Sequence, residues 1–244
     1  MIAMLLSAGV AFFVTIVATP VAIRFFRAQG IGQFIQDEVD HAHKQGTPTM
    51  GGLVMILAVV LGWLAGHLDA RTPEGAVSLN FKPFLTPGLL VLLAFVGMGL
   101  IGFLDDLAKV TRARNLGLNK RWKFAGQLAI SGLFAWGAVG YGATTELAFT
   151  RPLGIDLGWL YVIWVLVMLT AASNAVNFTD GLDGLASGSA ALVFGAFVII
   201  SFWQFRHPEF YSVVGTLEMA VLSAGLVGAT LGFLWWNAAP AKII

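Results

Sequence analysis

The polar stretch 174–186, NAVNFTDGLDGLA, places two amides, a threonine and two carboxylates between two long apolar runs. Polar groups at a membrane boundary carry a desolvation cost, so such a cluster predicts a functional site. Asn174 and Asn177 are three residues apart and can share one face of a helix. Asp180 and Asp183 have the same spacing, and Asp180 is the stronger candidate for catalysis. Because Asn, Asp, Thr and Gly also begin and end helices, a capping turn is the alternative, with Asp183 as cap of the next helix.

A second acidic group, Asp105 and Asp106, lies where the third apolar run ends. Two adjacent carboxylates at a lipid–water boundary repel each other unless a cation compensates their charge. Mg²⁺ suits this position, because proteins bind it through one or two carboxylates together with substrate phosphates. Lys109 follows Asp105 by four residues on the same helical face, so an ordinary ion pair within one helix is the alternative.

Three further segments carry polar residues on the same predicted side of the membrane. The glycines and proline of 46–52, GTPTMGG, predict a shaped turn whose backbone N–H groups could approach a phosphate. The basic residues between 112 and 123 fit cytosolic topology and contact with anionic lipids, and a phosphate-binding role for one or two of them would be additional. Asn237, a single amide at the end of the last apolar run, is interpreted as structural on its own.

The composition is that of an integral membrane protein. Of the 244 residues, 58% are hydrophobic and 11% are charged, against about 25% charged in a soluble domain. The net charge of +1 gives no indication of nucleic-acid binding. The absence of cysteine excludes disulfides, thiolate nucleophiles and cysteine-bound metals.

Seven apolar stretches predict membrane-spanning helices, within a single domain over residues 1–244. They cover residues 2–25, 51–68, 85–104, 124–142, 157–173, 185–204 and 217–236. Because the runs are continuous and do not alternate with period two, we expect an all-α polytopic fold. The first run lacks a basic n-region and is interpreted as a retained span rather than a signal peptide.

The basic residues set the expected orientation. Of the 14 Lys and Arg residues, ten fall in one set of loops and four in the other. Cytosolic loops are enriched in Lys and Arg, so the first set is expected in the cytosol and the N-terminus outside. The acidic pair and the stretch 174–186 would then share the cytosolic face.

Five motifs, taken together, resemble one family. They are GTPTMGG at 46–52, FLDDLAK at 103–109, RWKFAGQ at 121–127, NAVNFTDGLDGLA at 174–186 and FLWWNAAPA at 233–241. In order and spacing they resemble the phospho-N-acetylmuramoyl-pentapeptide-transferase family, within the polyprenyl-phosphate N-acetylhexosamine-1-phosphate transferases. The acidic pair and the NxxNxxDGxDG pattern are shared across that superfamily, whereas TPTMGG points to the muramoyl-pentapeptide branch.

The resemblance implies an Mg²⁺-dependent transferase of the bacterial cytoplasmic membrane with a cytosolic active face. Phospho-MurNAc-pentapeptide would pass from UDP-MurNAc-pentapeptide to undecaprenyl phosphate, giving lipid I and UMP in peptidoglycan synthesis. The implied catalytic residues are Asp105, as base or nucleophile, Asp106 and Asp180. The implied Mg²⁺ ligands are the same three residues and Asn177. The implied substrate-binding residues are Lys44, Thr49, Lys109, Lys123, Asn174, Asn177, Asp183 and Asn237.

The sequence departs from the family at its end. Family members continue with a segment like FMGDxGS, whose aspartate contributes to Mg²⁺ binding, and then with a His-rich loop, and they have ten spans. This sequence stops at Ile244, so we expect a C-terminally truncated member. Three alternatives stay open: a sister transferase that uses UDP-GlcNAc, an inactive fragment, and a transporter, although transport sites usually lie at the membrane midplane. Expected partners are the UDP-linked donor, undecaprenyl phosphate and membrane lipids, with a homodimer left open and no nucleic acid.

Overall fold

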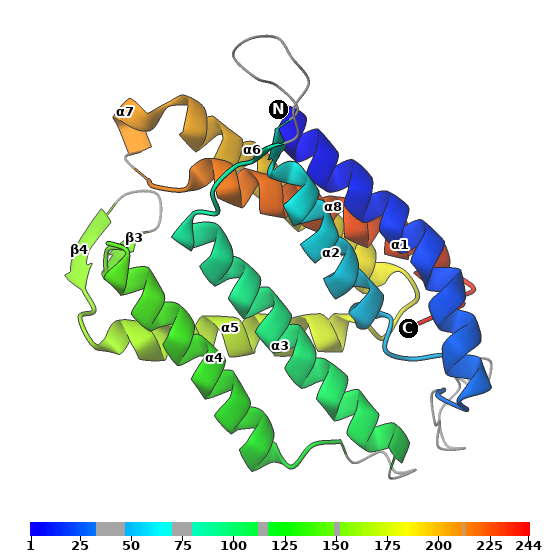
Figure 1. The fold of residues 1–244 in the computed structure, drawn as a ribbon. Coiled ribbons are helices and arrows are strands. Elements are labelled where there is room, and N and C mark those ends of the chain that lie inside the picture. Colours follow the sequence, from blue (N-terminus) through cyan, green and yellow to red (C-terminus); the bar gives the residue numbers. More distant parts are fainter. Residues whose placement is uncertain (33–46, 70–79, 112–116, 149–151, 212) are drawn as a thin grey trace.

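The computed structural model describes residues 1–32, 47–69, 80–111, 117–148, 152–211 and 213–244. Seven long helices dominate it (Figure 1). They are α1 (Ile2–Ala28), α2 (Gly52–Gly66), α3 (Thr86–Thr111), α4 (Lys120–Gly140), α5 (Leu160–Thr179), α6 (Leu185–Arg206) and α8 (Thr216–Asn237). The short helix α7 (Pro208–Tyr211) precedes α8. The predicted helical fold is confirmed, since each predicted span corresponds to one long helix.

Two short antiparallel strand pairs are the exceptions to the all-α expectation. β1 (Leu68–Asp69) pairs with β2 (Asn80–Phe81), and β3 (Glu146–Ala148) pairs with β4 (Pro152–Asp156). Both pairs lie in connections between long helices, and neither contributes to the core. The fold class is therefore unchanged.

Five helices in the described ranges are long and apolar enough to cross a membrane, namely α1, α3, α5, α6 and α8. The prediction of seven spans exceeds this number by two. Helix α2 has 15 residues, a length of about 22 Å, and a bilayer core is about 30 Å thick. Helix α4 begins with Lys120, Arg121 and Lys123, so its first turn is polar. The orientation of the chain stays a prediction.

Helix α8 lies at the centre of the bundle. In its most apolar window 61% of residues are buried, against 28% in α1 and 6% in α5. Helices α1 and α6 pack against α8, and α2 packs against both α1 and α8 (Figure 1). The main core cluster accordingly joins α1, α2 and α8 through Ala11, Ala58, Val59, Trp63, Val221, Leu222, Leu226 and Ala229. Small residues let membrane helices approach this closely.

Gly228 marks the closest approach of α8 to α1. A Cβ at this position would overlap the carbonyl oxygen of Ala8 and lie 2.8 Å from its carbonyl carbon and 3.0 Å from its Cα. These are backbone atoms, so they cannot rotate away. We expect Gly228→Ala to lower the free energy of unfolding by about 1–3 kcal/mol, measured by thermal or denaturant unfolding in detergent. Gly132→Ala in α4 is the matched control, because nothing lies within 4 Å of its Cβ; equal stability of the two variants would contradict this packing.

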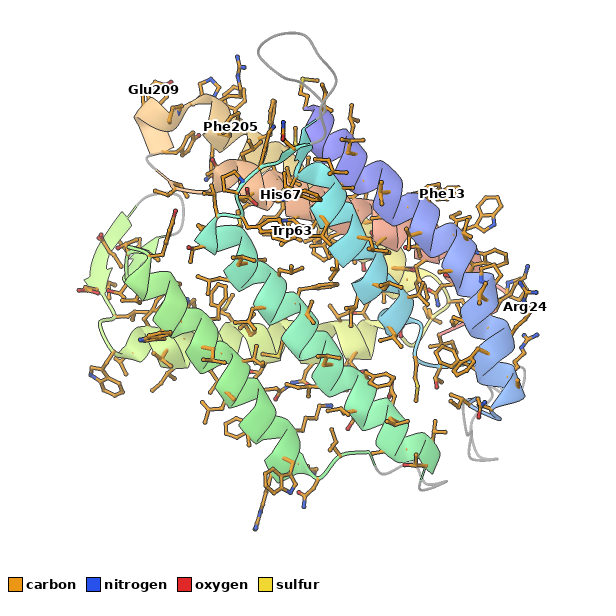
Figure 2. The ribbon with its side chains drawn as sticks, in the orientation of Figure 1. Phe13, Arg24, Trp63, His67, Phe205 and Glu209 are labelled. Carbon is orange, nitrogen blue, oxygen red and sulfur yellow. The ribbon has the colours of Figure 1, made fainter. Side chains whose placement is uncertain are left out.

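A buried pair, His67 and Glu218, lies at the C-terminal end of α2. His67 Nδ1 lies 2.9 Å from the carbonyl oxygen of Trp63, and its Nε2 lies 3.1 and 3.0 Å from the two carboxylate oxygens of Glu218 on α8. A carbonyl oxygen only accepts, so Nδ1 carries a proton, and one further proton lies between Nε2 and the carboxylate. Figure 2 shows Trp63 and His67 side by side at this end of α2. A Cβ at Gly88 would lie 2.7 Å from a Glu218 oxygen, so the first turn of α3 covers the pair.

A second core cluster lies where α1 and α8 end and α2 begins, away from the end of α2 that carries His67. Its buried members are Ile23, Phe26, Met50, Phe233 and Ile243. They come from the last turns of α1 and α8, the turn before α2 and the segment after α8. Phe103, Leu107 and Val110 of α3 pack against them. This cluster therefore brings three of the five sequence motifs, those at 46–52, 103–109 and 233–241, to one region, and Figure 1 shows α4 beside α3.

Candidate functional site

Two lysines and two aspartates form a charged group at the end of α3, which we call the lysine–aspartate group. Lys109 Nζ lies 3.0 Å from Asp105 Oδ2 and 2.8 Å from Asp106 Oδ1. Lys123 Nζ of α4 lies 3.7 Å from Asp105 Oδ2. The predicted ion pair within one helix is therefore present, and it extends to a second helix. The motifs at 103–109 and 121–127 meet here.

The sequence of α3 explains why these side chains point away from the core. Asp105 and Lys109 are each two residues from Leu107, which at about 100° per residue places them on the opposite side of the helix. The apolar face with Leu107 packs on the second core cluster. The charged face turns toward α4, where Asn119 caps the helix by accepting a hydrogen bond from the N–H of Arg121 at 3.1 Å. This cap places Lys123 in the first turn of α4.

The four charged side chains differ in their access to solvent. Asp105 is 14% exposed, whereas Asp106 is 41%, Lys109 39% and Lys123 33% exposed. Asp105 also accepts a hydrogen bond at Oδ1 from the N–H of Leu118, at 2.9 Å. Ion pairs with this exposure add little stability. The two lysines are therefore available to bind phosphate oxygens, and Asp106 is the more accessible carboxylate.

The motifs at 46–52, 174–186 and 233–241 meet at a second junction. Asn237 Oδ1 accepts hydrogen bonds from the N–H of Gly184, at 3.1 Å, and from Ser187 Oγ, at 2.9 Å. Its Nδ2 donates to the carbonyl oxygen of Ile243 at 3.0 Å. The N–H of Gly51 donates to the carbonyl oxygen of Ile244 at 3.0 Å, and the N–H of Ile244 donates to that of Pro48 at 2.9 Å. The loops that carry the motifs are thus joined mainly through backbone groups.

Asp183 does not cap α6, so that alternative is wrong. The N-cap residue is Gly184, at φ 75°, and no side chain caps this helix. Asp183 Oδ2 instead accepts a hydrogen bond from the N–H of Ala241 at 2.9 Å. The carboxylate thereby links the turn after α5 to the segment after α8. A substrate-binding role for Asp183 stays a prediction.

Asn174 and Asn177 both lie in α5, because this helix persists to Thr179. Both side chains are exposed, and Asn174 Nδ2 donates to the carbonyl oxygen of Thr170 at 2.8 Å. Asp180 is exposed at the C-cap of the same helix. The three residues therefore lie toward one exposed end of α5, and their roles in the site stay predictions.

Three further predicted substrate-binding residues differ in what the structure says of them. Lys44 lies outside the described residues. Thr49 precedes α2, and its hydroxyl oxygen is buried without a hydrogen-bond partner in the described part of the chain. Asn237 is 2% exposed, which agrees with its interpretation as structural and leaves its substrate-binding role a prediction.

We expect Asn237→Ala to destabilise the second junction. It would leave the Gly184 N–H and the Ile243 carbonyl oxygen without their partner, and the Ser187 hydroxyl with only its 3.4 Å hydrogen bond to the Gly184 carbonyl oxygen. An unpaired buried group costs about 1–3 kcal/mol. A lower melting temperature in detergent, with unchanged affinity for donor substrate in the folded fraction, is the expected result. Weaker donor binding at an unchanged melting temperature would instead support the substrate-binding role.

The donor set is compatible with Mg²⁺ but does not form a complete cage. In the part of the chain that the structure describes, no three His, Cys, Asp or Glu side chains gather closely enough to hold a metal ion. Asp105 and Asp106 supply two carboxylates side by side, and proteins bind Mg²⁺ with one or two carboxylates when phosphates supply further oxygens. The pair therefore fits a metal held jointly with a phosphate-bearing substrate.

Sequence reasoning missed three residues of these two groups. Gly117 and Leu118 contact Asp105 from the loop between α3 and α4, and Ser187 is the buried partner of Asn237. Ser187 directly follows the polar stretch 174–186, so extending that motif by one residue would have included it. No local pattern marks Gly117 or Leu118, because their role depends on a contact across 13 residues of sequence.

Comparison with known proteins places the chain in a family. The profile of glycosyl transferase family 4 matches residues 88–244. A relative in Beutenbergia cavernae named phospho-N-acetylmuramoyl-pentapeptide-transferase is 42% identical over 100% of this chain and 72% of its own length. Two further relatives have the same name. The one in Corynebacterium kroppenstedtii is 41% identical over 100% of this chain and 72% of its own length. The one in Streptomyces coelicolor is 42% identical over 98% of this chain and 71% of its own length. The chain therefore belongs to glycosyl transferase family 4, among the phospho-N-acetylmuramoyl-pentapeptide-transferases.

Proposed function

We propose that this chain transfers phospho-MurNAc-pentapeptide from its UDP carrier to undecaprenyl phosphate, forming lipid I and UMP in peptidoglycan synthesis. The observation that carries the proposal is the lysine–aspartate group. It places two partly exposed ammonium groups beside two carboxylates at the end of a membrane helix. A diphosphate donor and a monophosphate acceptor both need such cations.

The reaction moves one phosphoryl-linked sugar between two phosphates. An oxygen of the acceptor phosphate forms a bond to the sugar-linked phosphorus of the donor. The bond from that phosphorus to the bridging oxygen breaks, and the electron pair leaves with UMP. Such transfers depend on positioning and charge neutralisation more than on covalent chemistry of the protein. The product carries the diphosphate bond that the donor has lost.

Each residue of the lysine–aspartate group has a proposed role. Lys109 and Lys123 bind phosphate oxygens of the donor and offset the charge that develops on UMP. Asp105 accepts a proton from the acceptor phosphate through Oδ2, because Oδ1 is already held by the N–H of Leu118. Asp106, the more exposed carboxylate, is proposed to bind a metal ion.

Mg²⁺ is proposed as the cofactor of this site. When bound, it supplies positive charge to the diphosphate and to the departing UMP. Asp106 would hold it together with the donor's phosphates, and Asp105, Asn177 and Asp180 stay candidates for further ligands. Calorimetric titration of Mg²⁺ in the presence of UMP tests this without turnover. Asp106→Asn should weaken the binding, and equal binding by the variant and the wild type would contradict it.

The proposed setting is the cytosolic face of the bacterial inner membrane. Family membership and five apolar helices make the chain a membrane protein, and the excess of basic residues near the site supports the cytosolic side. Labelling of a Lys120→Cys variant with a membrane-impermeant thiol reagent in oriented vesicles would test that assignment. Labelling from the periplasmic side would contradict it.

Product formation tests the proposed function directly. The purified chain is incubated with radiolabelled UDP-MurNAc-pentapeptide, undecaprenyl phosphate and Mg²⁺, and labelled lipid is extracted. The Beutenbergia cavernae relative, prepared in parallel, is the positive control. We expect labelled lipid I and one UMP per lipid formed. Failure of the chain under conditions in which the relative is active would contradict the proposal, and preferential use of UDP-GlcNAc would favour the sister transferase.

A further inference from the structure

We propose that Gly117 and Leu118 form a backbone clamp that positions Asp105 for the transfer. We call these two residues the clamp. The inference rests on the proposed function, because it gives Asp105 a catalytic role. It adds two positioning residues to the site, neither of which touches substrate itself.

The first observation is the hydrogen bond between the clamp and the aspartate. The N–H of Leu118 donates to Asp105 Oδ1 at 2.9 Å. Lys109 Nζ and Lys123 Nζ lie 3.0 and 3.7 Å from the other oxygen, Oδ2. The two oxygens are therefore held by different groups, and the carboxylate cannot rotate about its Cβ–Cγ bond without losing a partner.

The second observation is the space at Gly117. A Cβ on this residue would overlap Asp105 Oδ1 and lie 2.7 Å from Cγ and 2.9 Å from Oδ2. Contacts under about 3 Å essentially never occur for real Cβ atoms, so the Asp105 carboxylate occupies the space that a Cβ on Gly117 would need. The position thus requires glycine for the space it leaves to the carboxylate.

Ordinary helix capping does not explain the clamp. The first turn of α4 already has its own side-chain cap in Asn119, which accepts from the N–H of Arg121. Asp105 instead reaches a backbone N–H that precedes this cap. The bond from Leu118 therefore fixes the Asp105 carboxylate from outside α3, and it is not needed to cap α4.

The consequence is a defined presentation of one oxygen. With Oδ1 engaged by Leu118, the acceptor phosphate meets Oδ2, which lies between the two lysines. A reacting group that is misplaced by about 1 Å can lose about 10²-fold in rate. The clamp therefore contributes to catalysis by holding the Asp105 carboxylate at a fixed position relative to Lys109 and Lys123.

Gly117→Ala tests the clamp, with Gly102→Ala as matched control. Gly102 lies on α3 close to Asp105, and nothing lies within 4 Å of its Cβ. In Gly117→Ala we expect the short Asp105 side chain to swing off Leu118 while the backbone stays in place. The expected result is kcat lower by about 10–100-fold, KM for the donor within about twofold of wild type, and a melting temperature like that of the control. Wild-type kcat in Gly117→Ala would overturn the positioning role.

Hydrogen exchange provides a readout that does not depend on turnover. In the wild-type protein the Leu118 amide should exchange slowly, and it should exchange faster in Gly117→Ala and in Asp105→Ala but not in Gly102→Ala. Rapid exchange of this amide in the wild type would overturn the clamp even if Gly117→Ala failed to fold. If the wild type formed no lipid I, the proposed function would fail, whereas the exchange rates would still decide whether Leu118 holds Asp105.

Discussion

Asp105→Asn should lower the rate of lipid I formation by about 10²–10⁴-fold, the range expected for loss of a general base. Asparagine keeps an oxygen that can accept the hydrogen bond from Leu118. The substitution therefore removes the charge and the basicity while leaving the contact with the clamp. Initial rates of labelled lipid I formation measure the effect, and circular dichroism and the melting temperature establish that the variant is folded.

Asp156→Asn is the matched control for this prediction. Asp156 ends the strand β4, where it accepts a hydrogen bond from the N–H of Gly158 at 3.0 Å, outside the long helices. Its substitution should leave the rate unchanged. Turnover near that of the wild type in Asp105→Asn would remove Asp105 from the mechanism and would transfer the role of base to the more exposed Asp106.

The second large effect is expected at the pair of His67 and Glu218. His67→Leu leaves a carboxylate that is 9% exposed without its partner, and removing one member of a buried pair costs about 3–5 kcal/mol. Glu218→Leu should cost a similar amount, because the imidazole then loses its acceptor. The double variant should be more stable than the sum of the two single effects predicts, since no buried charge remains. Denaturant unfolding in detergent of all four proteins gives the coupling energy.

Glu218→Gln is the control for the charge of the pair. Its amide nitrogen can donate to Nε2 of a neutral imidazole, while Nδ1 keeps its bond to Trp63. We expect a smaller loss of stability than in Glu218→Leu. Additive effects of His67→Leu and Glu218→Leu would contradict a coupled pair. Since Gly88, which covers the pair, precedes Asp105 by 17 residues, about 25 Å along α3, these variants should retain the kcat of the wild type when folded.

The helices and the membrane setting were predictable because long apolar runs are a local property of the sequence. Hydropathy located all seven long helices, but it ended the third at residue 104, whereas α3 continues through Asp105 and Lys109 to Thr111. Charged residues end an apolar run without ending a helix. The lysine–aspartate group depends on this extension.

The contacts that complete the site were beyond local patterns. Asn237 bonds to Ser187 across 50 residues, and His67 bonds to Glu218 across 151 residues. Each partner on its own has the appearance of an ordinary polar residue near a helix end. The motifs predicted which segments matter, since those at 46–52, 174–186 and 233–241 do meet. They could not predict that backbone groups would make most of the connections.

The central place of α8 has a consequence for biogenesis. Chains are made from the N-terminus onward, so α1, α2 and α6 are synthesised before α8, the helix against which all three pack. Until α8 is inserted, the small residues of α1 that receive it face lipid or other proteins of the insertion machinery. The same holds for the turn at Pro48–Gly51, whose backbone partner is Ile244. Before α8 is made, the earlier helices therefore pass through a period in which their polar interior groups depend on partners other than the native ones.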